Sequence, residues 1–160
     1  MPPRQTADTT GPVRGDAPPD AAYEHDFYSW SLEQARLVRD GRWDEIDREH
    51  LADAIESLGA EQFDKLEGAL RMLLIHILKW DHQPDKRGPS WTLSIKEQCA
   101  VLRGVLAANP GLKVRLDEAL ARAYEHARTR TARETGLREE AFPPACPYGF
   151  EDIILRPFAA

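Results

Sequence analysis

Three histidines fall in three different predicted helices, where they could together hold a metal ion. They are His50, His76 and His126. Imidazoles that converge inside a helical bundle bind a divalent metal and can leave one position open for water. His50 and His126 lie near the edges of their apolar stripes, whereas His76 lies well off the main apolar face of its helix. The sequence therefore favours surface or hydrogen-bonded histidines and keeps metal binding as an alternative function.

Asp47 and His50 have the spacing of one carboxylate–histidine half-site. A ferritin-like di-iron centre needs a second such pair and two further glutamates. No other histidine in the chain follows an Asp or Glu by three residues. The pair therefore does not predict a di-iron centre.

The two cysteines give little support to nucleophilic catalysis. Cys99 lies at the edge of an apolar helix face, where a thiol is usually inert packing, and Cys146 lies beside Pro147 in a loop. No Gly-rich phosphate loop, G-x-S-x-G elbow or H-E-x-x-H motif is present. The sequence predicts no catalytic, cofactor-binding or metal-ligating residue and no cofactor. Two distant cysteines without a C-x-x-C pair fit a reducing cytoplasm.

An arginine-rich helix near residue 125 is the best local feature for nucleic-acid binding. Its cations are Arg115, Arg122, Arg128, Arg130, Arg133 and Arg138, and its interleaved acids are Glu118, Glu125, Glu134, Glu139 and Glu140. Alternating signs on a helix usually mark a solvated face with weak ion pairs. The whole chain has 27 acidic and 21 basic residues, a net charge of −6, whereas phosphate binding needs clustered positive charge. Weak nucleic-acid binding is therefore a second alternative, and nucleic acid is an unlikely partner by composition.

The elements that position these residues are arranged around the segment from Leu66 to Trp80. Its apolar residues recur at spacings of three, four and seven, which places them on one helical face: Phe63, Leu66, Leu70, Leu73, Leu74 and Ile77. Met72 and Ile75 lie on the opposite side, so the helix is apolar nearly all round. Such a helix is buried on more than one side. It is too short and too charged at its ends to cross a bilayer, which takes about 20 apolar residues.

The remaining pattern predicts an all-α domain over residues 23–160, a single bundle of about five main helices around this central helix. The first predicted helix starts near the acidic residues Glu24 to Asp26, runs to about Arg39 and stops at Gly41, a plausible left-handed residue. The others run from an Asp44 cap to Gly59, from there to Trp80, from a Ser90 cap to Asn109, from Pro110 to about Gly136, and from Phe150 to Leu155. The apolar C-terminal tail is expected to fold back over an edge of the core. Residues 1–22 hold five Pro and two Gly and almost no large aliphatic side chain, which predicts a disordered leader. No secretory or membrane-anchoring segment is predicted there.

The sequence leaves open whether the chain turns at Gly59 or continues through it as a kinked helix. A turn would make the flanking helices antiparallel and bring Asp47 opposite Arg71, since each lies twelve residues from Gly59. Asp47 is in phase with the stripe formed by Leu51, Ala54, Ile55 and Leu58. On this basis the sequence predicts an Asp47–Arg71 ion pair. The alternative is that Asp47 supports the start of the second helix beside Asp44.

Several stretches, in this order and spacing, resemble the bacterial family called domain of unknown function family twenty-nine. They are YEHDFYSW, DREHLADAIESLG, LLIHILKW followed by QP, SWTLSIKEQ, NPGL and FPPACPY, and together they span about residues 23–156. The resemblance implies an all-helical fold with no assigned activity, cofactor or catalytic residue. The family pattern commonly has Asn where His50 stands and Arg where Cys99 stands. These departures argue against a family-wide reaction at either position.

A non-enzymatic role through protein–protein interaction is the remaining hypothesis. The partner is unidentified, and the pattern does not indicate an oligomeric state or a membrane. Trp43, Trp80 and Trp91 would support a partner surface if they were exposed and contiguous, because exposed aromatic residues often anchor interfaces.

Overall fold

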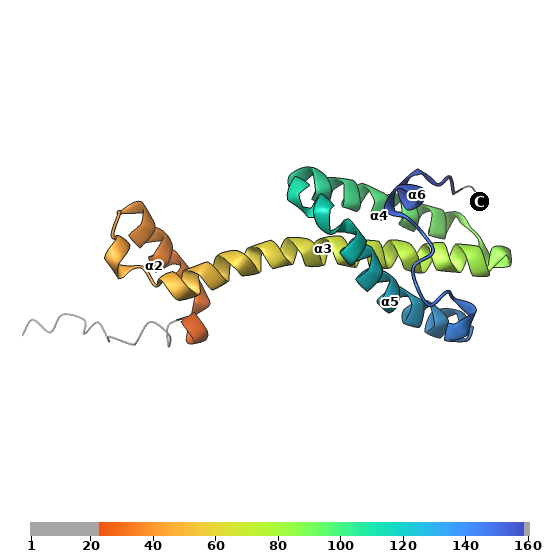
Figure 1. Ribbon diagram of the computed structural model, residues 1–160, viewed down its shortest axis with the longest axis horizontal. Coiled ribbons are helices and arrows are strands. Elements are labelled where there is room, and N and C mark those ends of the chain that lie inside the picture. The colour runs from red at the N-terminus through yellow and green to blue at the C-terminus, as the bar shows by residue number, and fades with distance from the viewer. Residues whose placement is uncertain (1–22, 159–160) are drawn as a thin grey trace, which may run out of the picture. The chain divides into compact units, whose positions relative to one another are not determined.

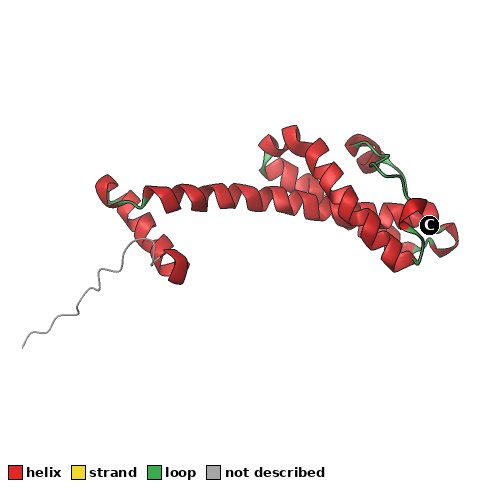
Figure 2. Cartoon of the chain, turned by 60° about the horizontal axis from the view of Figure 1, so that its bottom comes forward, coloured by secondary structure: helices red, strands yellow, loops and turns green. Residues whose placement is uncertain are grey.

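The computed structural model describes residues 23–158, which form helices joined by short loops and contain no β-strand (Figure 2). The elements follow one another in the order α2 (Phe27–Arg39), η1 (Trp43–Glu45), α3 (Arg48–His82), η2 (Pro84–Lys86), α4 (Pro89–Ala108), η3 (Pro110–Arg115), α5 (Leu116–Thr135), η4 (Glu139–Ala141) and α6 (Phe150–Leu155). Figure 1 labels the α-helices among them. The η elements are short 3₁₀ helices. The all-α prediction is confirmed. The predicted leader, residues 1–22, lies outside the described residues.

The described residues divide into two compact units. We call the part up to Glu56 the N-terminal unit and the part from Ser57 onward the C-terminal unit. The N-terminal unit holds α2, η1 and the start of α3, and the C-terminal unit holds the rest of α3 and every later element.

Helix α3 is continuous through Gly59, so of the two arrangements that the sequence leaves open the chain adopts the one without a turn. A glycine inside a helix costs only about 1 kcal/mol relative to alanine, and the flanking residues favour helix. The chain therefore does not reverse, and the predicted Asp47–Arg71 ion pair is wrong. Ile55 and Leu58 of the predicted apolar stripe are each 60% exposed, so this part of the stripe is open to solvent.

The helix ends follow the sequence signals at three of the predicted positions. Asp26 caps α2 by accepting a hydrogen bond from the Ser29 N–H at 3.0 Å. Gly41 and Gly136 have φ values of 70° and 73°, the left-handed conformation that glycine adopts without strain.

Three other helix starts differ from the prediction. Helix α3 begins after Asp47 rather than after Asp44, and α4 begins at Pro89 with Gly88 before it, so Ser90 does not cap it. The segment from Pro110 to Arg115 is a 3₁₀ helix, and the α-helical conformation begins only at Leu116.

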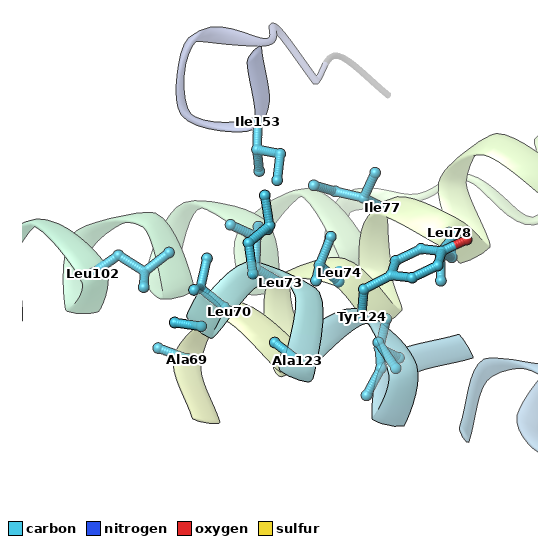
Figure 3. Packing of buried hydrophobic residues seen from close by; sticks show 14 of the residues in the cluster. Ala69, Leu70, Leu73, Leu74, Ile77, Leu78, Leu102, Ala123, Tyr124 and Ile153 are labelled. Atoms are coloured by element: carbon cyan, nitrogen blue, oxygen red, sulfur yellow. The ribbon is translucent and has the colours of Figure 1, made fainter. Parts of the chain in front are cut away.

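The core of the C-terminal unit surrounds the second half of α3, as predicted. Leu70, Leu73 and Leu74 are completely buried, and Figure 3 shows them in one cluster with Leu102 of α4 and Ala123 of α5. Fully burying one leucine stabilises a fold by about 1.5–3 kcal/mol. The side of α5 that faces the core carries small residues, which allow its backbone to approach α3 closely: Ala119, Ala123 and Ala127, all with 0% exposure.

The C-terminal tail covers this core, as the sequence predicts. Phe142 and Ile153 are 1% and 2% exposed, and Ile153 of α6 points toward Leu73 and Ile77 (Figure 3). Asp81 at the end of α3 holds the tail in place, because it accepts hydrogen bonds from Arg156 at 2.9 Å and from the Tyr148 hydroxyl at 2.8 Å.

Candidate interaction surface

Asp47 connects the two helices of the N-terminal unit. Its carboxylate accepts a hydrogen bond from Trp30 Nε1 at 3.1 Å, and its backbone N–H donates to Gln34 Oε1 at 2.9 Å. The same carboxylate lies 2.8 Å from His50 Nδ1 and accepts from the His50 N–H at 3.3 Å. Asp47 is therefore the N-terminal cap of α3 and also the anchor for α2, so the predicted cap at Asp44 is wrong.

These hydrogen bonds change the acidity of Asp47. Burial works against the charged carboxylate, but hydrogen bonds from His50 and Trp30 outweigh this effect and hold the pKa of Asp47 below its usual value. Asp47 is therefore ionised at neutral pH, and it keeps the Trp30 indole fixed against the start of α3.

Aromatic side chains fill the space between α2 and the start of α3. The Tyr23 ring stacks on His50 with 4.4 Å between centroids and meets Trp30 edge-on at 4.8 Å. The inner face of α2 is completed by Leu37, which is 4% exposed, and by the buried Gln34. The core-facing side of α2 is thus already occupied within the N-terminal unit.

The opposite face of α2 is apolar and open to solvent. Tyr28 and Leu32 lie one helical turn apart and are 73% and 54% exposed. Trp43 in η1 is 59% exposed. We call Tyr28, Leu32 and Trp43 the exposed apolar set of the N-terminal unit. Large apolar side chains that adjoin on one helix face and remain exposed, as Tyr28 and Leu32 do, are typical of interaction surfaces.

Three charged side chains near the end of α2 are paired with one another. Arg36 contacts Glu33 at 2.7 Å and Asp40 at 3.0 Å, and all three side chains are largely exposed. Exposed pairs of this kind contribute little to stability. A partner for this surface would therefore be recognised mainly by apolar contacts.

Of the three tryptophans that could support a partner surface, only one is exposed. Trp43 is exposed, but Trp80 is 5% exposed and Trp91 is half-buried. Trp80 is covered by Phe158, whose ring lies 5.6 Å away, and by the Arg87 guanidinium at 5.1 Å. Trp43, Trp80 and Trp91 therefore do not form one exposed surface.

The three histidines of the metal hypothesis have separate local surroundings. His50 pairs with Asp47, His76 Nδ1 lies 2.8 Å from the Met72 carbonyl oxygen, and His126 is exposed on α5. In the part of the chain that the structure describes, no three His, Cys, Asp or Glu side chains are grouped closely enough to hold a metal ion. The geometry therefore adds no support to this alternative.

Most of the arginines near α5 are bound to carboxylates. Arg115 pairs with Glu118, Arg122 with Glu67 and Glu118, Arg128 with Glu139, and Arg130 with Glu134. These pairs neutralise the positive charge that a phosphate backbone would need. The arrangement therefore fits a solvated helix face better than a nucleic-acid interface.

Both cysteines are free thiols, and burial raises the pKa of Cys99 and of Cys146. A raised pKa keeps a thiol protonated and unreactive at neutral pH. Neither cysteine is therefore placed as a nucleophile.

The sequence did not reveal that Trp30, Gln34 and Asp47 form one hydrogen-bonded group. A signal was present, because Gln34 lies four residues after Trp30 on the apolar face of a helix. A polar residue on such a face usually has a buried partner.

The comparison with protein families gives one match over nearly the whole chain. The family model described as Domain of unknown function DUF29 matches residues 22–159. The chain belongs to this family. The DUF29 description assigns no activity, so membership brings no catalytic or ligand-binding residue to the chain. No curated protein and no solved structure matches it.

Over the described residues, no helix combines the length and the apolar composition that crossing a bilayer requires.

Proposed function

We propose that this DUF29 protein is a non-enzymatic helical protein that binds a protein partner through the exposed apolar set of its N-terminal unit. The observation that carries the proposal is the position of Tyr28 and Leu32, which lie on the face of α2 opposite its filled inner face and are 73% and 54% exposed. We place its action in the bacterial cytoplasm, which agrees with the family resemblance and with two free cysteines.

The spacing of Tyr28 and Leu32 suits a helix of the partner. Residues at i and i+4 form a ridge on one helix, and a second helix with an apolar stripe can pack against that ridge. Trp43 adds an aromatic ring of the kind that often contributes most of the binding energy at an interface. A partner helix with a single apolar stripe is therefore the expected ligand.

Photo-crosslinking in cells that naturally make the protein tests this proposal. A photoreactive phenylalanine derivative replaces Leu32 in one version of the full chain and Leu93 in the other. Leu93 is a matched control, because it is 64% exposed and lies on α4 in the C-terminal unit. We expect a discrete crosslinked product from position 32 and none of the same size from position 93.

A second substitution shows whether the product depends on the apolar set. Tyr28→Ser in the position 32 version should abolish most of the crosslinking, because it removes the neighbouring half of the ridge. Mass spectrometry of the product then shows whether the partner is a different protein or a second copy of this chain. No product at position 32, or the same product from positions 32 and 93, would contradict the proposal.

A further inference from the structure

A groove in the C-terminal unit runs between α4 and the segment formed by α6 and the residues after it. It consists of two adjoining hollows of about 380 Å³ and 270 Å³, which share Arg103 and Ile154 in their linings. The helices α4 and α6 are labelled in Figure 1. Each volume is near the lower limit of pockets that bind small molecules.

The floor of the groove is apolar. Ile95 and Cys99 of α4 are 2% and 7% exposed, and the half-buried Ile154 and Phe158 form the facing side. In the second hollow, Leu106 and Phe150 continue this surface. An apolar floor of this kind favours the hydrocarbon part of a ligand.

The wall formed by the tail is held firmly in place. Arg156 and the Tyr148 hydroxyl both bind the Asp81 carboxylate, at 2.9 Å and 2.8 Å, and the Arg156 guanidinium lies 5.0 Å from the centre of the Phe158 ring. Arg156 also lines the groove, but its charge is already compensated by Asp81. The wall formed by the tail is therefore positioned by contacts within the protein itself.

Three other cations at the groove have no such compensation. Lys96 and Arg103 are seven residues apart and so share one side of α4, and Lys113 lines the second hollow from η3. Among the described residues, none of these three side chains makes an ion pair or hydrogen bond, and no Asp or Glu lines either hollow. These unpaired cations contrast with the rest of the chain, which has a net charge of −6 and in which most arginines near α5 are paired.

We propose that this groove binds a single-chain amphipathic anion, such as a free medium-chain carboxylate. Its head group would lie at the Arg103 guanidinium, which suits a carboxylate because it can donate two parallel hydrogen bonds. Its chain would lie on the floor formed by Ile95, Cys99 and Ile154. This inference is independent of the partner surface on the N-terminal unit.

Calorimetric titration of the full chain with decanoate, below its micelle concentration, tests the proposal. Acetate lacks the chain and decanol lacks the charge, so we expect decanoate to bind one per chain and both other probes to bind much more weakly. Arg103→Gln should weaken decanoate binding about ten- to a hundredfold, as expected for the loss of a hydrogen bond to a charged group. Arg133→Gln is the matched control, with the same change of charge at an exposed position outside the groove, and should bind as the unchanged chain does.

The position of the ligand can be read by photolabelling. A decanoate analogue that carries a diazirine on its chain should label the α4 peptide that contains Ile95 and leave the α5 residues around His126 unlabelled, as measured by mass spectrometry. Three results would overturn the inference: decanol binding as tightly as decanoate, Arg103→Gln binding as tightly as the unchanged chain, or no labelling of the α4 peptide that contains Ile95.

Discussion

Asp47 is the residue on which the N-terminal unit depends most. Asp47→Ala removes the cap of α3 and leaves the Trp30 indole N–H and the His50 ring without their acceptor. We expect the free energy of unfolding to fall by about 1–3 kcal/mol, the usual cost of a lost cap or an unsatisfied buried donor. Urea unfolding followed by circular dichroism measures this change.

Asp44→Ala is the control for the Asp47 substitution. Asp44 is exposed in η1 and makes no side-chain hydrogen bond or ion pair within the described part of the chain, so its loss should change stability by less than about 0.5 kcal/mol. If Asp44→Ala were the more damaging change, the assignment of Asp47 as the cap would be wrong.

Leu74 lies at the centre of the C-terminal core with 0% exposure. Leu74→Ala should reduce the free energy of unfolding by about 2–5 kcal/mol, because it removes buried methyl groups and leaves a cavity. Leu93→Ala changes the same side-chain type at a position that is 64% exposed, and it should cost far less. Similar losses for the two variants would show that the core is centred elsewhere.

The residues of the central core follow from the sequence alone, whereas the partners of single polar residues do not. Leu70, Leu73 and Leu74 repeat with helical spacing, and burial of such a stripe does not depend on which neighbour covers it. The partner of Asp47, in contrast, depends on the direction of the chain after Gly59. The predicted Asp47–Arg71 pair depended on a turn at Gly59, and in the continuous helix the partners of Asp47 are Trp30 and His50 instead.

At the scale of the element, the continuity of α3 through Gly59 can be tested directly. A Cβ atom added at Gly59 meets no other atom within 4 Å, and the residue is exposed inside a helix. Gly59→Ala should therefore raise the free energy of unfolding by about 0.5–1 kcal/mol, through higher helix propensity and a less flexible unfolded chain. Urea unfolding followed by circular dichroism, as for Asp47→Ala, measures this change in the free energy of unfolding.

Gly136→Ala is the contrasting variant, because Gly136 has a φ of 73° at the end of α5. Alanine is strained in this conformation, and stability should fall by about 1 kcal/mol. If Gly59→Ala destabilised the protein as Gly136→Ala does, a turn at Gly59 would be indicated and a continuous helix refuted.

The tail that contains α6 should show a pH dependence at acid pH. Burial opposes ionisation of Asp81, but hydrogen bonds from Arg156 and Tyr148 dominate and hold the pKa of Asp81 below its usual value. A carboxyl group with a lowered pKa in the folded state stabilises the fold above its unfolded pKa of about 4, and this contribution is lost as the pH falls through the folded pKa. The stability difference between the unchanged chain and Asp81→Asn should therefore be full at pH 6 and shrink below about pH 4.

Asp85→Asn controls for the general effect of removing an acid near this end of α3. Asp85 is exposed in η2 and has no ion pair within the described residues. Its substitution should leave the unfolding free energy nearly unchanged across the same pH range. A stability difference for Asp81→Asn that did not diminish at low pH would contradict the role given to its charge.

Helix ends were predictable where one residue type is strongly favoured by the backbone. Gly41 and Gly136 end helices because a left-handed residue is needed there, and Asp26 begins one because its carboxylate reaches a free N–H. The start of α3 was not predictable in this way, since Asp44 and Asp47 are both good caps. Contact with Trp30 and Gln34 of α2 selects Asp47.

At the scale of the whole molecule, the sequence predicts the helical class and the buried centre but not the surfaces that remain open. Trp43 and Trp80 are the same residue type with exposures of 59% and 5%, because only Trp80 is covered by the folded tail. The groove beside Arg103 likewise depends on where α6 lies, which no local pattern specifies. The match to DUF29 identifies the family of the protein but assigns no activity to it.

If the proposed partner surface is right, Leu32 and its neighbours are open in the isolated chain and covered by a partner in the cell. The most direct measurement compares the labelling rate of a Leu32→Cys thiol by a membrane-permeant maleimide in purified protein and in the cells that make it. Leu93→Cys on α4 is measured in parallel to correct for reagent entry. We predict that labelling at position 32, relative to position 93, is several times slower in cells than in purified protein. Equal relative rates in both settings would contradict the claim.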